Sequence, residues 1–411
     1  MEPIFSIEDA GEAPPPAPPL ARVELLPAEI RRSILFCIDD LEDLRAMVLA
    51  SRAYRAQYLL ERKRYLCQTL KASLGTVLVD AYAVQDATST PYTSPEDVRS
   101  FLKTYATMHI TPRQTRPSTR FVLEDHATES DVVSMAAFYR GCMRTLPETF
   151  VTLFHQTFKP QFEACTLSAT ERLRLLRGLY RFHLYCILFG NVPFAQENPK
   201  ALDSRRGATC RDLSSEDKME MFFLTFPPWE AEEIASIHCV IQLEYDSVLD
   251  KVKEDFHRDH SRFSYWNDMY TPPGAWPYPT CQDDYAEGMP SRGIQVFHQI
   301  LTSNSHDKLV ELVDKYSVRA YNFFQDAVND NGNLEIEEVD DDQAVISFTY
   351  DTEERAPLAW VRMAKGIYRA DGFGNQVPDN LKEWGIVFWD SERLDRANLD
   401  DDEYALYSWF Y

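Results

Sequence analysis

The chain has 411 residues, of which 45% are hydrophobic and 13% aromatic, and this length suits two or three packed units. A formal net charge of −23 excludes an extended surface for nucleic acid or for anionic membranes, because both need clustered Lys and Arg. No stretch reaches the roughly 18 apolar residues of a membrane span, and the acidic first residues do not resemble a secretory signal. We therefore expect a cytoplasmic or nuclear protein.

Residues 1–22 are expected to form a disordered, proline-rich leader. Five of the seven residues from position 13 to position 19 are prolines. Proline has no backbone N–H to donate, so such a stretch forms neither a helix nor a sheet. A binding site for a proline-recognising module is the alternative interpretation.

Residues 23–75 are predicted to form three helices. Residues at fourfold spacing give the first helix one apolar face: Ile30, Ile34 and Ile38. Asp40 is the expected N-cap of the second helix, because its carboxylate can accept the free backbone N–H groups of the first turn. A single third helix is expected from about position 53 to position 74.

This segment resembles an F-box. The resemblance lies in a Leu-Pro-x-Glu-Ile opening, an Ile-Leu pair, an Ile-x-Asp-Leu-x-Asp-Leu turn and a Leu-x-Ser-Arg-x-Tyr end. The matching residues are Leu26, Pro27, Glu29, Ile30, Ile34, Leu35, Ile38, Asp40, Leu41, Asp43, Leu44, Leu49, Ser51, Arg52 and Tyr54. In that family the motif docks on the Skp-type adaptor of a cullin-RING ubiquitin ligase, and the domain that follows holds the substrate.

The resemblance implies a substrate receptor that contacts the adaptor through apolar side chains. The implied adaptor anchors are Leu26, Pro27, Ile30, Leu35, Ile38 and Leu44. Its partners would be the Skp-type adaptor and an unknown protein substrate. The alternative is a non-catalytic scaffold in which the N-terminal helices pack on the rest of the chain and leave no face for a partner.

Residues 76–411 are expected to form a mainly α-helical body. Its most apolar helix is predicted to begin at Ser168, with Glu171 completing a capping box, and to end at Gly190. Apolar residues occupy most of the circumference, so we expect this helix at the centre of the body. His183 lies on it, and a hydrogen-bonded core histidine is the preferred interpretation over a ligand.

Two more helices are predicted at 229–255 and 306–324. Just after the first, His257 and His260 are spaced so that they can share one helix face, as metal ligands would. No second Cys or His cluster follows at a ligand-like distance. A polar helix end is therefore the preferred interpretation, and we expect no metal and no cofactor.

The stretch 265–285 alternates aromatic residues with prolines. Four of its side chains are candidate contacts for a partner or ligand: Trp266, Tyr270, Trp276 and Tyr278. A cap fixed on the helical core is the alternative interpretation. A ligand-binding or enzymatic role of the chain, which we keep as the less favoured hypothesis, would use this stretch.

Two features mark the C-terminal part. Alternating polar and apolar residues predict a small β-hairpin at about 333–350. The Trp-Gly-(x3)-Trp-Asp-(x2)-Arg-Leu pattern from Trp384 to Leu394 resembles a signature of filamentous-fungal proteins, many with an F-box-like start and none with a known reaction. Trp384, Phe388 and Trp389 are the expected core anchors.

The sequence contains no recognisable catalytic motif. A glycine-rich phosphate loop, a Gly-x-Ser-x-Gly elbow and a His-Glu-x-x-His pair are all missing. The eight cysteines include no Cys-x-x-Cys pair, so free thiols are expected. We therefore predict a mainly α, acidic, intracellular protein-protein interaction module and favour this role over that of an enzyme.

Overall fold

The computed structural model describes residues 23–90, 92, 94–109, 121–158, 166–192, 213–266, 270–276, 281–319, 323–324, 327–328, 351, 355–361 and 379–396. These residues form helices and contain no strand, which confirms the predicted mainly α fold. The leader (1–22) and the predicted β-hairpin (333–350) lie outside the described residues, as does Tyr278.

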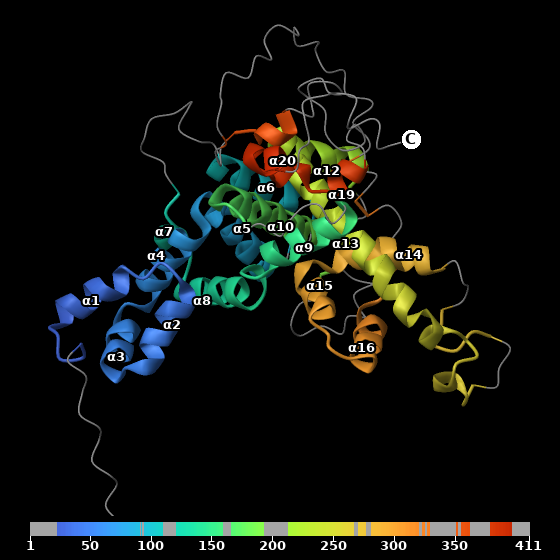
Figure 1. Ribbon diagram of the computed structural model, residues 1–411, viewed down its shortest axis with the longest axis horizontal. Coiled ribbons are helices and arrows are strands. Elements are labelled where there is room, and N and C mark those ends of the chain that lie inside the picture. The colour runs from blue at the N-terminus through green and yellow to red at the C-terminus, as the bar shows by residue number, and fades with distance from the viewer. Residues whose placement is uncertain are drawn as a thin grey trace, which may run out of the picture.

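The N-terminal helices lie at one end of the molecule (Figure 1). They are α1 (Ala28–Phe36), α2 (Leu41–Ala50), α3 (Arg52–Leu60) and α4 (Arg62–Leu74). Helix α3 packs on α1 and α2, all three pack on α4, and α4 in turn packs on α7 and α8 of the body. We call α1 to α4 the N-terminal unit.

The body contains the remaining helices. Before the central helix come η1 (Gly75–Val77), α5 (Leu78–Ser89), α6 (Pro95–His109), α7 (Leu123–His126), α8 (Glu129–Phe138), the π-helical η2 (Tyr139–Met143) and α9 (Leu146–Phe158). The central helix and those after it are α10 (Ala169–Phe189), α12 (Ser215–Met221), η4 (Phe223–Thr225), α13 (Pro228–Val252), η5 (Lys253–Phe256), η6 (Ser261–Phe263), α14 (Cys281–Gly288), η7 (Met289–Arg292), α15 (Ile294–Leu301), α16 (His306–Tyr316), α19 (Asp379–Glu383), η11 (Ile386–Phe388) and α20 (Ser391–Arg396).

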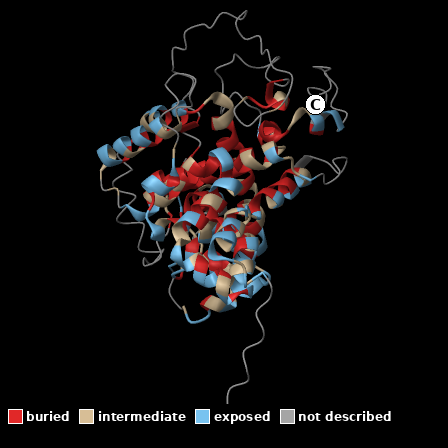
Figure 2. Ribbon diagram, turned by 90° about the vertical axis from the view of Figure 1, so that its left-hand side faces the viewer, coloured by how far each residue is buried: buried red, intermediate tan, exposed pale blue. Residues whose placement is uncertain are grey.

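Helix α10 runs through the middle of the body, as its apolar circumference predicted. It packs along α5 and α13, and nearly all of its side chains from Arg174 onward are buried. Figure 2 shows the buried residues gathered in the middle of the molecule, with exposed residues on the outer helices. The predicted capping box is present, because Ser168 and Glu171 each bond the other's backbone N–H.

Two predicted helix boundaries are wrong. The third helix does not run unbroken to position 74, because the chain leaves helical geometry at Glu61, where α3 ends before α4 begins. The carboxylate of Glu61 accepts hydrogen bonds from Arg32 (2.7 Å) and Arg64 (2.9 Å), which hold this bend. The helix predicted at 306–324 ends at Tyr316, where Ser317 takes up a non-helical backbone.

Candidate functional site: the N-terminal unit and the groove beside it

Local capping sets the shape of the N-terminal unit. Pro27 has an extended backbone and precedes the first residue of α1, so it begins the helix without losing a needed N–H. Asp40 caps α2 as predicted, because its Oδ1 accepts from the N–H groups of Glu42 (2.7 Å) and Asp43 (3.2 Å). Ser51 caps α3 in the same way. These caps separate three short helices that could not be stable alone.

The six predicted adaptor anchors lie in three environments. Pro27 and Ile30 are exposed, Leu26 and Ile38 are half-buried, and Leu35 and Leu44 are buried in the core of the unit. The two buried leucines therefore hold the helices together. The accessible part of the predicted set is the start of α1.

Exposed apolar side chains are concentrated on the N-terminal unit and on the segment just before it. Six of the ten large hydrophobic side chains that are exposed in the described residues fall between positions 23 and 60: Val23, Leu25, Ile30, Leu49, Leu59 and Leu60. Single exposed leucines are ordinary on protein surfaces, but a concentration of this kind on one small unit is typical of an interaction site. We use the name apolar face for these six residues taken together; they lie on the segment before α1 and on α1, α2 and α3.

The unit is joined to the body by α4 and by ion pairs at its edges. Tyr65, Leu70 and Leu74 of α4 are fully buried. Glu42 pairs with Arg140 of η2 at 3.2 Å. These contacts cover part of the unit, and the six residues of the apolar face stay exposed.

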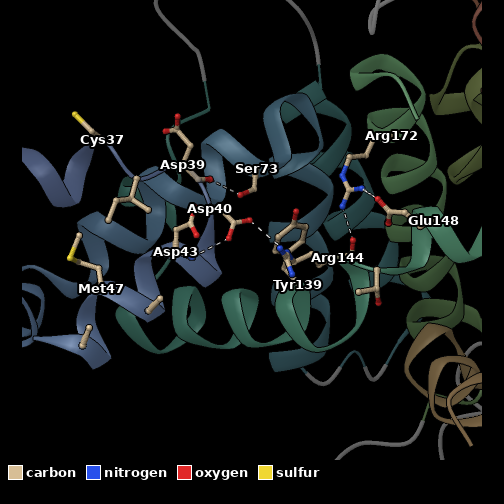
Figure 3. A pocket seen from close by; sticks show the side chains of 14 residues that line it. Cys37, Asp39, Asp40, Asp43, Met47, Ser73, Tyr139, Arg144, Glu148 and Arg172 are labelled. Atoms are coloured by element: carbon tan, nitrogen blue, oxygen red, sulfur yellow. Dashed lines mark hydrogen bonds and ion pairs between the residues drawn. The ribbon is translucent and has the colours of Figure 1, made fainter. Parts of the chain in front are cut away.

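A large groove separates the N-terminal unit from the body. It has a volume of about 1270 Å³. Asp39, Asp40 and Asp43 lie on one wall, whereas Arg144 and Arg172 lie on the other (Figure 3). Its apolar lining comes from the loop after α1 and from α2: Ile38, Ala46, Met47 and Ala50. A smaller cavity of about 270 Å³ lies between α2 and α8.

The charges in the groove are only partly paired. Arg144 pairs with Asp40 at 3.6 Å, and Arg172 bonds Glu148 and the carbonyl oxygen of Arg144. None of the ion pairs among the described residues includes Asp39 or Asp43, whose side chains are exposed. The unpaired charge of the groove is therefore negative. Sequence reasoning missed this groove, because its two walls are about a hundred positions apart in the chain.

A buried ionic network connects α10 to its neighbours. Asp80 of α5, which is 1% exposed, accepts from Arg181 of α10 at 2.9 Å and from the hydroxyl of Tyr105. Burial alone would raise the pKa of Asp80, but Arg181, His109 and Tyr105 together hold it well below its ordinary value. The network therefore keeps a buried carboxylate ionised.

The network continues into α13 and has the features of a structural clamp. Arg181 also pairs with Glu230 at 2.6 Å, and Arg177 forms a two-point pair with Glu233. Burial raises the pKa of Glu233, although Arg177 opposes this effect. Each cation is matched to carboxylates in the interior. Arg177, Arg181 and Glu233 do not line the groove beside the N-terminal unit or the two smaller cavities of about 380 and 270 Å³ in the described residues. Sequence reasoning missed this network. The signal that could have indicated it is the spacing of Arg174, Arg177 and Arg181, three and four positions apart on a largely apolar helix.

The C-terminal signature docks on the start of α10. Phe388 and Trp389 are buried, as predicted, whereas Trp384 is only half-buried. The Trp389 indole N–H donates to the carbonyl of Trp384. Asp390 accepts from Arg174 at 2.8 Å, and Arg393 pairs with Glu171. The conspicuous pattern of this segment thus corresponds to packing and ion pairing inside the body.

The aromatic stretch divides into a packed and an exposed part. Trp276 stacks on Phe256 at 4.9 Å between ring centroids and touches Tyr285. Tyr270 is exposed, and its carbonyl accepts from the indole N–H of Trp266. The packing of Trp276 therefore fits the interpretation of this stretch as a cap on the helical core, whereas Tyr270 is accessible to a partner.

The histidines singled out in the sequence have ordinary environments. Nδ1 of His183 accepts from the backbone N–H of Ile294, and burial lowers its pKa to about 3, so it is a neutral core histidine. His257 is exposed. Within the described ranges no three His, Cys, Asp or Glu side chains gather as a metal site would require.

None of the helices in the described part of the chain is both long enough and apolar enough to cross a membrane. Comparison with protein-family models, with curated proteins and with solved structures found no match for this chain. The resemblance of the N-terminal unit to an F-box stays a prediction from the sequence motif.

Proposed function

We propose that this protein is an F-box-type substrate receptor. In this proposal the apolar face of the N-terminal unit docks on a Skp-type adaptor of a cullin-RING ubiquitin ligase. The helical body then holds a protein substrate. Such a receptor would act in the cytosol or the nucleus.

The observation that carries the proposal is the concentration of exposed apolar side chains on a unit at one end of the molecule (Figure 1). Leu25 is 66% exposed and Leu60 is 77% exposed, so water contacts most of both side chains. Covering such groups with a partner contributes roughly 25 cal/mol for each Å² of apolar surface that is removed from water. The same unit carries the motif that resembles an F-box.

The structure suggests a sharper test than removing the whole unit. Leu25→Asp together with Ile30→Asp introduces charge into the apolar face at two exposed positions, so the fold is expected to persist. Leu224→Asp is the matched control, because Leu224 is also an exposed leucine but lies in η4 of the body. Mutating Leu35 or Leu44 would not be informative, since both are buried and their loss would unfold the unit.

The readout is complex formation with a purified Skp-type adaptor, measured by size-exclusion chromatography and calorimetry at micromolar concentrations. We expect the wild type and the Leu224 variant to bind alike and the double variant to bind at least tenfold more weakly. Absence of a wild-type complex would refute the receptor proposal. Strong protection of residues 26–52 from hydrogen exchange in the isolated protein would instead support the alternative, a scaffold whose N-terminal helices are covered by the rest of the chain.

A further inference from the structure

The groove between the N-terminal unit and the body is a second candidate interaction site, separate from the apolar face. We infer that it binds a short cationic segment, containing Lys or Arg beside aliphatic residues, of another protein. Because we identify that protein as the recruited substrate, the inference rests on the proposed function. The apolar lining, the carboxylates and the size of the groove carry it.

The volume of the groove favours a peptide over a small molecule as its occupant. Small-molecule pockets usually enclose roughly 300–1,000 Å³, and the groove is larger, at about 1270 Å³. Its two walls come from different parts of the fold and are bridged by the Arg144–Asp40 pair at 3.6 Å, so an extended segment would lie along the open side of the groove, over this pair (Figure 3). A metal ion does not suit it, because no three ligand side chains in the described residues converge there.

Charge identifies the occupant as cationic. Four carboxylates line the groove (Asp39, Asp40, Asp43 and Glu148) against two guanidinium groups (Arg144 and Arg172), which leaves a formal charge of −4 + 2 = −2. Both arginines already bond carboxylates within the groove. An anionic segment would meet Asp39 and Asp43 with no cation available, whereas a Lys or Arg of a partner could pair with them.

The apolar lining adds a requirement for aliphatic side chains. Ala46 and Ala50 are exposed on α2, and Met47 is half-buried beside them. Two small residues and a flexible thioether leave room for a partner side chain and adapt to its shape. A cationic segment without aliphatic residues would leave this lining in contact with water, so we expect it to bind more weakly.

The test uses the full-length protein and three fluorescein-labelled decapeptides. The first combines Lys and Arg with Leu, the second replaces every Lys and Arg by Glu, and the third replaces every Leu by Ser. Affinity is measured by fluorescence anisotropy between about 0.05 and 0.3 M salt, because pairing with exposed carboxylates weakens as screening increases. We expect the Lys/Arg/Leu probe to bind best and the Glu probe not to bind.

Two variants locate the binding. Asp39→Asn with Asp43→Asn removes the unpaired carboxylates, and Ala46→Trp fills the apolar lining. We expect each to weaken binding of the first probe at least tenfold. Glu254→Gln with Asp259→Asn is the matched control, because it makes the same change in net charge at two exposed positions, one within η5 and one three residues after its end. It should leave affinity within twofold of the wild type.

Four results would overturn the inference. Three are no saturable binding of the first probe, equal binding of the Glu probe, and unchanged affinity in both groove variants. The fourth is a loss in the control equal to that in the double aspartate variant, since it would show attraction to net charge alone. Adaptor binding is measured on the same samples. Loss of peptide binding with intact adaptor binding disproves only the groove, and the reverse result disproves only the receptor role.

Discussion

Glu171 and Arg393 are 222 positions apart and form a two-point ion pair inside the body. The Arg393 Nε donates to Oε1 at 2.8 Å and Nη2 donates to Oε2 at 2.6 Å, and the two side chains are 3% and 5% exposed. The Arg393 guanidinium also lies over the Trp389 ring at 4.7 Å. This pair fastens α20 to the first turn of α10.

Arg393→Met should destabilise the protein strongly, because it leaves the Glu171 carboxylate buried without its cation. Removing one partner of a buried pair costs about 3–5 kcal/mol of unfolding free energy. Arg396→Met is the control, since Arg396 pairs with Glu392 at the surface and such pairs contribute about 0–1 kcal/mol. Urea unfolding of both variants measures the difference, and equal losses would show that burial of the pair is unimportant.

Tyr105→Phe removes the hydroxyl that donates to Asp80 and leaves the rest of the ring in place. Because Asp80 is fully buried, we expect a loss of about 1–3 kcal/mol in unfolding free energy. Tyr82→Phe is the matched control, because its hydroxyl makes only a long, exposed contact with the carbonyl of His126 (3.5 Å). A loss in the Tyr105 variant no larger than in the control would contradict a stabilising role of the network.

Stability should fall as the pH is lowered from about 6.5 toward 3. Burial lowers the pKa of His183 and of His238 from 6.5 to about 3 in the folded state. In that window the unfolded chain binds more protons, so each histidine contributes a slope of about 1.4 kcal/mol per pH unit in favour of higher pH.

His238→Phe should reduce the slope of unfolding free energy against pH by the contribution of one histidine, about 1.4 kcal/mol per pH unit. A phenyl ring can keep the stack with Phe324, which lies at 4.2 Å and is nearly parallel. Urea unfolding at several pH values between 4 and 7 measures the slope, with His257→Phe as the control at an exposed position. Parallel curves for the wild type and the His238 variant would refute the assignment of His238 as a buried neutral group.

Gly385→Ala should destabilise the junction between α19 and η11. Gly385 has a φ of +65°, and a Cβ at this position would lie 2.9 Å from the Phe154 ring. The left-handed backbone costs about 1–2 kcal/mol, and the clash adds about 1–3 kcal/mol. Gly141→Ala is the control, because a Cβ there meets nothing within 4 Å. Similar melting temperatures for the two variants would contradict this expectation.

The helices that sequence reasoning predicted well have strong local signals. Ser168 and Glu171 indicated the start of α10, and the continuous apolar pattern indicated its central position; both are confirmed. The Asp40 cap of α2 is confirmed for the same reason, since a capping side chain acts on backbone groups only two or three residues away.

Features that depend on distant contacts were not predictable. The break at Glu61 is marked by no Gly or Pro in the sequence. It is held by Arg32 from another helix, which the local sequence does not reveal. Burial of Leu35 and Leu44 also follows from how α1 and α2 meet their neighbours. An apolar periodic face shows that a side chain is covered, but it does not tell whether the same chain or a partner covers it.

The pairing of Arg174 has a consequence for how the chain folds during synthesis. Its carboxylate partners Asp351 and Asp390 are 177 and 216 positions further along the chain. At typical translation rates the ribosome needs about 10–40 s to add the longer of these stretches. The N-terminal unit can assemble from neighbouring residues in that time. Helix α10 must wait with an unmatched cation, so we expect the nascent body to depend on chaperones in the interval.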